Sequence, residues 1–285
     1  MGADEMKRLH LADRDITTDR PAFIMGIVNA TPDSFYSASR GGIDRALQLI
    51  DEGADIIDIG GESTRPGSVY VDETEELRRV VSVIELLRRR SNIPISVDTR
   101  KQAVMEAAWN AGADILNDIS ALEDAENMAS FAADNKLPVI LMHKRGVPKT
   151  MQETTSYVDV CKQVSSYLEE RAAVAEAAGI VSDKIIVDPG IGFGKGLDEN
   201  RQLIWNCGSL CGGKYPVLMA LSRKSCIGAM VGETDAADDG RLYGTLAANM
   251  IAVQRGATLL RVHDVKACRN TLDVIKSFKG CRMAN

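Results

Sequence analysis

The sequence has few of the features that mark a membrane protein or a nucleic-acid-binding protein. Aromatic residues make up only 5% of its 285 residues, and no apolar run approaches the roughly 20 residues that a membrane-spanning helix requires. Its 34 Lys and Arg residues are outnumbered by 40 Asp and Glu residues, which gives a formal net charge of −6. An acidic chain offers no electrostatic footprint for nucleic acid or for an anionic membrane. We therefore expect neither as a partner, and local positive groups would have to hold any anionic ligand.

Patterns for metal-binding and nucleophilic sites are also missing. The six cysteines, at positions 161, 207, 211, 226, 268 and 281, lack the paired spacing of a zinc site, so we interpret them as reduced thiols. Of the three histidines, His143 and His263 follow apolar runs and could form a zinc pair, but no third soft ligand stands at a suitable place. No Ser-His-Asp or Cys-His arrangement is evident, which disfavours a hydrolase. The polar start MGADEMKRLH shows no signal peptide, and we expect a reducing, cytoplasmic location.

What is present is a repeated pattern of short apolar runs, each rich in Ile, Val and Leu and followed by a segment with helical spacing. The runs cover residues 22–29, 55–60, 94–98, 115–118, 138–143, 184–188, 215–222 and 259–264. A parallel strand buried on both faces has such a run, and its first polar residues lie at its carboxyl end. Eight βα units predict an α/β fold with a single TIM-type (β/α)8 barrel domain over residues 1–285, although an open doubly wound sheet would share the pattern. For the polar residues 1–20 we expect an N-terminal extension or a hairpin over the bottom of the barrel.

Helices are expected between the strands, at residues 42–53, 72–90, 124–136, 155–178 and 241–255, with one more ending at Gly112 and another beginning near residue 198. In the second of these, acidic residues crowd the start and Arg88, Arg89 and Arg90 stand at the end. That order complements the helix dipole, so we interpret the arginine run as a helix terminus rather than as a phosphate site.

Polar residues at the predicted carboxyl ends of the strands form the candidate site. Carboxylates and amides could accept or complement the N–H donors of a planar heterocycle, or each could simply cap a helix or pin a loop: Asn29, Asp98, Asn117, Asp118 and Asp188. Cationic residues at the same face indicate a ligand with phosphate or carboxylate, unless they pair with the aspartates: Arg65, Arg223, Lys224, Arg261 and His263. Arg223 is the strongest candidate among these for a purely structural role.

Glycine is concentrated in the segment DPGIGFGKG at residues 188–196. Four glycines directly after a predicted strand permit close backbone approach to a ligand. The segment lacks the ending of a Walker A loop, and no acidic residue completes a dinucleotide-binding fingerprint. It therefore predicts a loop that meets a ligand without naming the ligand.

Eight blocks, in order, closely resemble the signature segments of bacterial dihydropteroate synthases. They are MGIVNATPDSF (25–35), GADIIDIGGESTRPGS (53–68), ISVDTRK (95–101), GADILNDISAL (112–122), LMHKRGVPKTMQ (141–152), DPGIGFGK (188–195), SRKSCIG (222–228) and RVHDV (261–265). The resemblance implies a TIM-type barrel, usually a homodimer, that is a transferase of folate biosynthesis and a sulfonamide target. Such enzymes join 6-hydroxymethyl-7,8-dihydropterin diphosphate to p-aminobenzoate and release diphosphate, with Mg²⁺ as cofactor.

The resemblance also implies roles for individual residues. The pterin would be held by Asp98, Asn117, Asp188 and Lys224, with Arg261 stacked against it. The diphosphate would meet Thr64, Arg261 and His263, with Mg²⁺ bound at Asn29. Ser222 and the loops around Phe35 and Arg65 would form the p-aminobenzoate side. The catalytic set is then Arg261, His263, Lys224, Asp33 and Phe35.

Departures from the family pattern keep two other functions open. Ser37 stands where the family commonly has a second acidic residue in loop one, and Asp33 could compensate; Leu221, Cys226 and Glu199 also differ and could alter sulfonamide sensitivity. A folate-dependent methyltransferase barrel would share the pterin-binding core, although GESTRPG and the SRK block favour the synthase. A non-catalytic pterin-binding paralogue would be consistent with the altered loop one.

Overall fold

Eight parallel strands form one sheet that curls into a barrel. The computed structural model describes residues 6–30, 40–62, 70–146, 155–233 and 239–278. The strands are β3 (Phe23–Asn29), β4 (Ile56–Gly60), β5 (Ile95–Asp98), β6 (Ile115–Asp118), β7 (Val139–Met142), β8 (Ile185–Asp188), β9 (Leu218–Met219) and β10 (Leu259–Val262). Their order in the sheet is β8-β7-β6-β5-β4-β3-β10-β9, and a bridge between Val187 and Val217 joins its two edges. The prediction of a barrel rather than an open sheet is confirmed.

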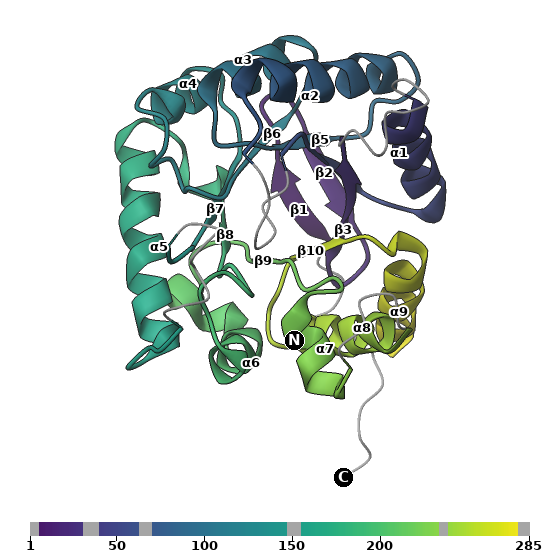
Figure 1. Ribbon diagram of the computed structural model, residues 1–285, viewed down its shortest axis with the longest axis vertical. Coiled ribbons are helices and arrows are strands. Elements are labelled where there is room, and N and C mark those ends of the chain that lie inside the picture. The colour runs from purple at the N-terminus through teal and green to yellow at the C-terminus, as the bar shows by residue number, and fades with distance from the viewer. Residues whose placement is uncertain (1–5, 31–39, 63–69, 147–154, 234–238, 279–285) are drawn as a thin grey trace.

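Helices surround the strands on the outside (Figure 1). They are α1 (Arg40–Glu52), α2 (Glu73–Arg88), α3 (Gln102–Asn110), α4 (Met128–Asp134), α5 (Val160–Ala177), α6 (Leu197–Trp205), α7 (Ser225–Val231), α8 (Asp239–Gln254) and α9 (Val265–Ser277), with 3₁₀ turns η2 (Ser182–Lys184) and η3 (Cys207–Gly213). None of the helices among the described residues has the length and apolar character needed to cross a membrane.

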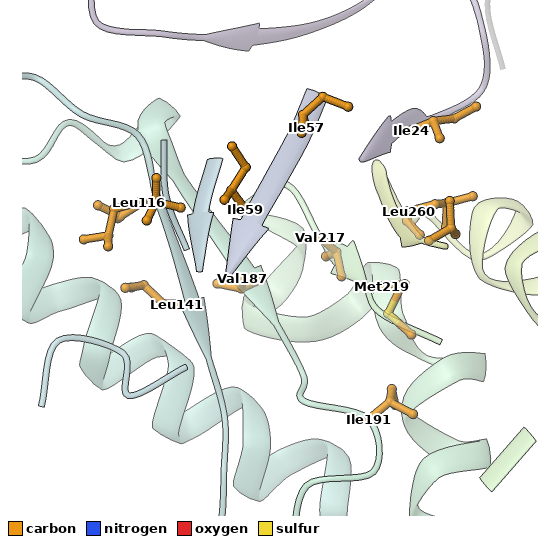
Figure 2. Packing of buried hydrophobic residues seen from close by; sticks show 14 of the residues in the cluster. Ile24, Ile57, Ile59, Leu116, Leu141, Val187, Ile191, Val217, Met219 and Leu260 are labelled. Atoms are coloured by element: carbon orange, nitrogen blue, oxygen red, sulfur yellow. The ribbon is translucent and has the colours of Figure 1, made fainter. Parts of the chain in front are cut away.

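Two apolar layers hold the barrel together because side chains alternate across each strand. The outward layer packs between strands and helices and includes Ile24, Ile57, Leu116 and Leu260 (Figure 2). The inward layer fills the lower lumen with Phe23, Met25, Ile56, Ile115, Ile140, Ile186, Leu218 and Leu259. Burying such side chains is the main source of the barrel's stability, at about 1.5–3 kcal/mol for each fully buried one.

An antiparallel hairpin covers the amino ends of the strands. It pairs β1 (Lys7–His10) with β2 (Asp15–Thr18). Leu9 and Leu11 are buried in the same inward layer as Phe23 and Ile56, which stand at the amino ends of their strands. The hairpin therefore closes the bottom of the barrel, where we expected an extension or hairpin.

The second helix shows why its charged residues stand where they do. Asp72 caps α2 by accepting a hydrogen bond from the Glu75 backbone N–H at 3.0 Å. At the other end the Arg88 guanidinium donates to the carbonyls of Gly112 and Ile93 and pairs with Asp114. The helix ends within the arginine run, and Arg88 ties that end to the next βα unit rather than facing a ligand.

Three elements are clearly shorter than predicted, and one of them is α5, which begins at Val160 rather than at residue 155. The run 215–222 contributes only β9 and the Val217 bridge to the ladder, because Pro216 has no N–H and the Val217 N–H is bonded to the Thr258 side chain. Helix α4 begins at Met128 rather than at residue 124. Residues 123–127 form bends and turns instead of the predicted first helical turn.

Candidate active site

Polar side chains replace apolar ones in the lumen at the carboxyl ends of the strands. Asn117, Asp188 and Arg261 stand two positions after the inward-facing apolar residues Ile115, Ile186 and Leu259. Asp98 stands two positions after the buried Ser96 on β5. The register places Gly60 beside Asp98 and Asp98 beside Asn117. Four of the predicted pterin and diphosphate residues are thereby aimed at one end of the barrel, where TIM barrels carry their active sites.

The centre of this group is an arginine held by two carboxylates. Arg261 Nε lies 2.6 Å from Asp58 Oδ2, and its Nη2 lies 2.7 Å from Asp98 Oδ2. Asn117 donates from Nδ2 to Asp58 Oδ1 at 3.3 Å. Burial would lower the pKa of Arg261, but the two carboxylates outweigh it and raise that pKa. The guanidinium is a fixed positive charge at the floor of the site.

The two carboxylates share one cation, and this leaves excess negative charge in the lumen. Burial raises the pKa of Asp98 to about 7, the Arg261 charge opposes that rise, and the nearby Asp58 adds to it. Asp98 therefore titrates near neutral pH. A carboxylate in that range suits the binding of a heterocycle whose own charge changes during a reaction.

A second carboxylate and a lysine stand across the lumen. Burial raises the pKa of Asp188 and lowers the pKa of Lys224, and each charge partly offsets the effect on the other. Lys224 Nζ donates to the Ile191 carbonyl at 2.6 Å and lies 4.8 Å from the centre of the Phe193 ring. The lysine is thus held by the glycine-rich loop predicted to meet a ligand.

Ser222 and His263 lie together at the ends of neighbouring segments. Ser222 Oγ is 3.0 Å from His263 Nδ1 and accepts the His263 backbone N–H at 3.1 Å. Arg223, between Ser222 and Lys224, pairs with Asp264 through two bonds of 2.8 and 3.0 Å. These contacts support the structural interpretation of Arg223 and show that Ser222 orients His263.

Asp118 has a structural role, one of the two alternatives left open for it. Its carboxylate accepts from the Ser120 N–H and hydroxyl at 2.7 Å each and from the Leu122 N–H at 2.9 Å. It therefore pins the turns before α4 and does not join Asp98 and Asn117 in the lumen.

Several predicted residues lie outside the described part of the chain. They are Asp33, Phe35, Ser37, Thr64 and Arg65. Their assignment to the leaving group and to p-aminobenzoate stays a prediction. Flanking residues are described: Asn29 is exposed at the end of β3, next to Gly60 of β4.

Comparison with known proteins explains this constellation. The model of the family described as pterin binding enzyme matches residues 25–263. The chain is 46% identical to the dihydropteroate synthase of Haemophilus influenzae over 256 residues, which are 88% of this chain and 92% of the relative. This chain belongs to the dihydropteroate synthase family of pterin-binding enzymes.

Solved structures of dihydropteroate synthases have the same fold. The enzyme of Xanthomonas albilineans with 4-aminobenzoic acid matches with a TM-score of 0.89 and 43% identity, covering 98% of this chain and 100% of that one. The enzyme of Yersinia pestis in a sulfonamide drug complex matches with a TM-score of 0.89 and 37% identity, covering 96% and 100%. The resemblance in the sequence blocks is confirmed at the level of the whole chain.

Sequence reasoning missed Asp58, the most buried charge of the site. It has no exposed surface and contacts both Arg261 and Asn117. The available signal was a single aspartate inside the apolar run IIDIG, at a position that faces the lumen. A buried charge is stable only with a partner, so its presence in a buried strand could have indicated one.

A buried ion-pair network beside Asp98 was also missed. Glu76 on α2 accepts from the Thr99 hydroxyl at 2.7 Å and from Lys101 Nζ at 2.6 Å. Lys101 also contacts Glu62 at 3.3 Å and the Val71 carbonyl. A small hollow at Asp98 is lined by Glu62, Glu76, Thr99, Arg100 and Ile119. The network fixes the segment after β5 against the ends of the segment that carries Thr64 and Arg65.

The residues at this end of the barrel suit Mg²⁺ only as part of a ligand complex. Asn29 offers an amide oxygen, a ligand type that Mg²⁺ accepts. Among the described residues no three His, Cys, Asp or Glu side chains cluster as a metal site. Mg²⁺ commonly uses few protein ligands together with substrate phosphates and water, so a single amide oxygen fits an ion that arrives with a diphosphate.

Proposed function

We propose that this chain transfers the dihydropterin-6-ylmethyl group from 6-hydroxymethyl-7,8-dihydropterin diphosphate to p-aminobenzoate and releases diphosphate. The observation that carries the proposal is Arg261, clamped by Asp58 and Asp98 opposite the Asp188 and Lys224 pair, at the active end of a dihydropteroate synthase barrel. Pterin recognition and stabilisation of the leaving anion account for the charged residues of this group.

The lumen carboxylates and amide suit the pterin ring. A carboxylate accepts two N–H donors from a planar heterocycle, and an amide offers both donor and acceptor. Asp98, Asn117 and Asp188 supply these groups from three different strands. Lys224 supplies a donor for a ring carbonyl from the segment after β9. The ring would lie above the apolar lower lumen, with Arg261 beneath or beside it.

The chemistry needs charge stabilisation more than proton transfer. The bond between the pterin methylene and the diphosphate oxygen breaks, and the dihydropterin delocalises the positive charge that develops. The p-aminobenzoate nitrogen, a neutral nucleophile near pH 7, forms the new C–N bond and then loses a proton to solvent. Arg261 and His263 would stabilise the departing anion, and the Asp98 carboxylate would stabilise the cation.

We also propose Mg²⁺ as the cofactor, held by Asn29. When bound, Mg²⁺ would offset charge on the diphosphate. Support comes from the oxygen ligand of Asn29 at the mouth of the barrel and from the anionic leaving group. Titration of the protein with Mg²⁺ in the presence and absence of pterin diphosphate tests this, because the ion should bind measurably only with the ligand.

Purified protein tests the function directly. Product and diphosphate should form only when pterin diphosphate and p-aminobenzoate are both present with Mg²⁺. Binding of the pterin substrate without product would indicate a non-catalytic paralogue. Methyl exchange from methyltetrahydrofolate would indicate the methyltransferase alternative and would exclude the synthase assignment.

We propose that sulfonamides compete at the p-aminobenzoate side and that a reducing cytoplasm is the protein's location. We also propose a homodimer formed through α8 and α9. The two helices pack side by side and expose apolar side chains: Tyr243, Met250, Ile251 and Val274. All cysteines of the described residues are free thiols, consistent with that compartment. Sedimentation equilibrium on the protein and on Tyr243→Glu tests the dimer, since the charged variant should shift it toward monomer.

A further inference from the structure

The glycine-rich loop after β8 is built around a buried ammonium group. Lys195 Nζ donates to the carbonyls of Gly190 and Phe193 at 2.9 Å each. It also lies 2.9 Å from His143 Nδ1 and 3.3 Å from the His143 carbonyl. Lys195 is only 3% exposed, and its hydrogen bonds within the described residues go to carbonyl oxygens and to the His143 ring rather than to a carboxylate. Burial lowers the pKa of Lys195 to about 7, but the carbonyl oxygens and the imidazole nitrogen around Nζ can all accept hydrogen bonds, which suits the ammonium form, a group that only donates.

His143 acts as the neutral fourth partner of this ammonium. Burial, with the nearby Lys195 charge, lowers the pKa of His143 to about 3, so the imidazole is neutral at physiological pH. Its Nδ1 then accepts from Lys195, which leaves the ring proton on Nε2. The ring also packs edge-on against Tyr167, with 5.0 Å between centroids. His143 is thereby committed to holding Lys195 and is not available as a metal ligand.

The loop approaches the end of β7 too closely for any residue but glycine at one point. Gly190 has φ +66°, and a Cβ there would lie 1.9 Å from the His143 carbonyl oxygen. This close approach brings the Gly190 and His143 carbonyls to the same ammonium. Lys195 therefore joins the loop after β8 to the end of β7 through His143, which lies 52 residues away from it along the chain.

The same loop holds Lys224. Lys195 binds the carbonyls of Gly190 and Phe193, which flank Ile191. The Ile191 side chain is fully buried in the outward apolar layer (Figure 2), and its carbonyl accepts from Lys224 Nζ. With Gly190 and Phe193 fixed on either side of Ile191 and Gly192, the Ile191 carbonyl and the Phe193 ring keep the directions that hold Lys224.

We propose that Lys195 is a positioning residue for the pterin site: it orders the loop 189–196 so that Lys224 is aimed at the pterin ring. The proposal rests on the proposed function, because it assigns Lys224 to the pterin. Asn200 binds the outer side of the loop, accepting from the Gly192 N–H at 2.8 Å and donating to the Lys195 and Gly196 carbonyls. Lys195 is the partner on the inner side, where Lys224 docks.

Lys195→Met tests the role, with Lys184→Met as its matched control. Lys184, just before β8, also donates to a backbone carbonyl, that of Lys136, but at the bottom of the barrel. Losing a hydrogen bond to a charged group commonly shifts a folding equilibrium about tenfold or more, and here that equilibrium is the ordering of the loop that holds Lys224. Lys195→Met should therefore raise KM for pterin diphosphate about tenfold or more, while KM for p-aminobenzoate changes little. Lys184→Met should leave both unchanged.

A pterin KM in Lys195→Met equal to that of the control overturns the proposal, as does an equal rise for both substrates. If Lys195→Met does not fold, His143→Phe is compared with His143→Gln. The first removes an acceptor, and the second keeps a carbonyl oxygen. A pterin KM raised several-fold only in the first supports the role, and equal values overturn it. Wild-type protein that forms no product refutes the proposed function instead, a result separate from any difference between variants.

Discussion

The two ends of the barrel are made by the same eight strands, yet charged side chains lie in different places at the two ends. At the bottom, the lumen is apolar, and charged groups such as Arg88 and Asp114 pair on the rim outside it. At the top, Asp58, Asp98 and Arg261 face the lumen itself, with two carboxylates for one guanidinium. The bottom therefore supplies stability, whereas the top holds charges that folding alone would not favour. Such excess negative charge can be balanced by the positive charge that develops on the dihydropterin as the diphosphate leaves.

The largest expected effect comes from removing the cation at the top. Arg261→Met keeps most of the side-chain volume and removes the charge shared by Asp58 and Asp98. Steady-state kinetics should show kcat/KM lowered by about 100-fold or more, by analogy with the loss of an oxyanion donor. Arg223→Met is the control, because that guanidinium pairs with Asp264 instead. Equal losses in both variants would mean that the lumen position of Arg261 is not what matters.

A matched change at the bottom should affect stability without affecting chemistry. Leu9→Ala empties space between the hairpin and the inward layer, where Leu9 is 4% exposed. Urea denaturation should show a free energy of unfolding lower by about 2–4 kcal/mol. Under conditions where the protein is folded, kcat/KM should stay near the wild-type value. The control is Met6→Ala, at a side chain 58% exposed, which should change neither the free energy of unfolding nor kcat/KM appreciably. A large kinetic effect of Leu9→Ala would contradict the assignment of stability to the bottom and chemistry to the top.

The sequence predicted the bottom and the top to different extents. Apolar runs and their polar ends are local signals, so the strands and the residues Asp98, Asn117 and Asp188 could be found from them. Asp58 and Lys195 could not, because their roles depend on contacts that exist only in the closed barrel. Arg261, the partner of Asp58, lies 203 residues along the chain, and His143, the partner of Lys195, lies 52 residues away. The eight blocks resembled a known family. That resemblance gave no role to Asp58 or Lys195, which contact other residues of the protein rather than a ligand.

The pH dependence should separate activity from stability at the top. Burial raises the pKa of Asp98 to about 7, and its ionised form is the one that accepts pterin N–H donors. We expect kcat/KM to fall as pH drops below about 7, approaching tenfold per pH unit. The free energy of unfolding should instead rise as pH drops. Because the folded pKa lies above the ordinary value of 3.8, ionising Asp98 costs stability as pH rises from about 4 to about 7.

Asp98→Asn tests whether Asp98 causes both the fall in kcat/KM and the gain in stability at lower pH. The variant cannot ionise, so it should lose the acidic limb of the kcat/KM profile together with part of the fall in stability between pH 4 and 7. Thermal unfolding and kinetics across the same pH series measure the two. An acidic limb that persists in the variant would assign it to another group, for which Asp188 is the first candidate because burial raises its pKa as well.

The smallest expected effect tests whether Asp58 acts on the pKa of Asp98 through its negative charge or only through its packing. Asp58→Asn keeps a side chain that can accept from Arg261 but removes a negative charge that raises the pKa of Asp98. In Asp58→Asn the charges that still act on Asp98 are those of Arg261, Glu76 and Asp118. The midpoint pH of the acidic limb should therefore move below about 7. Ser96→Ala is the control: Ser96 is fully buried on β5, and its hydroxyl has no hydrogen-bond partner among the described residues. That neutral change should leave the midpoint in place, whereas equal midpoints in all three proteins would show that Asp58 acts only by packing.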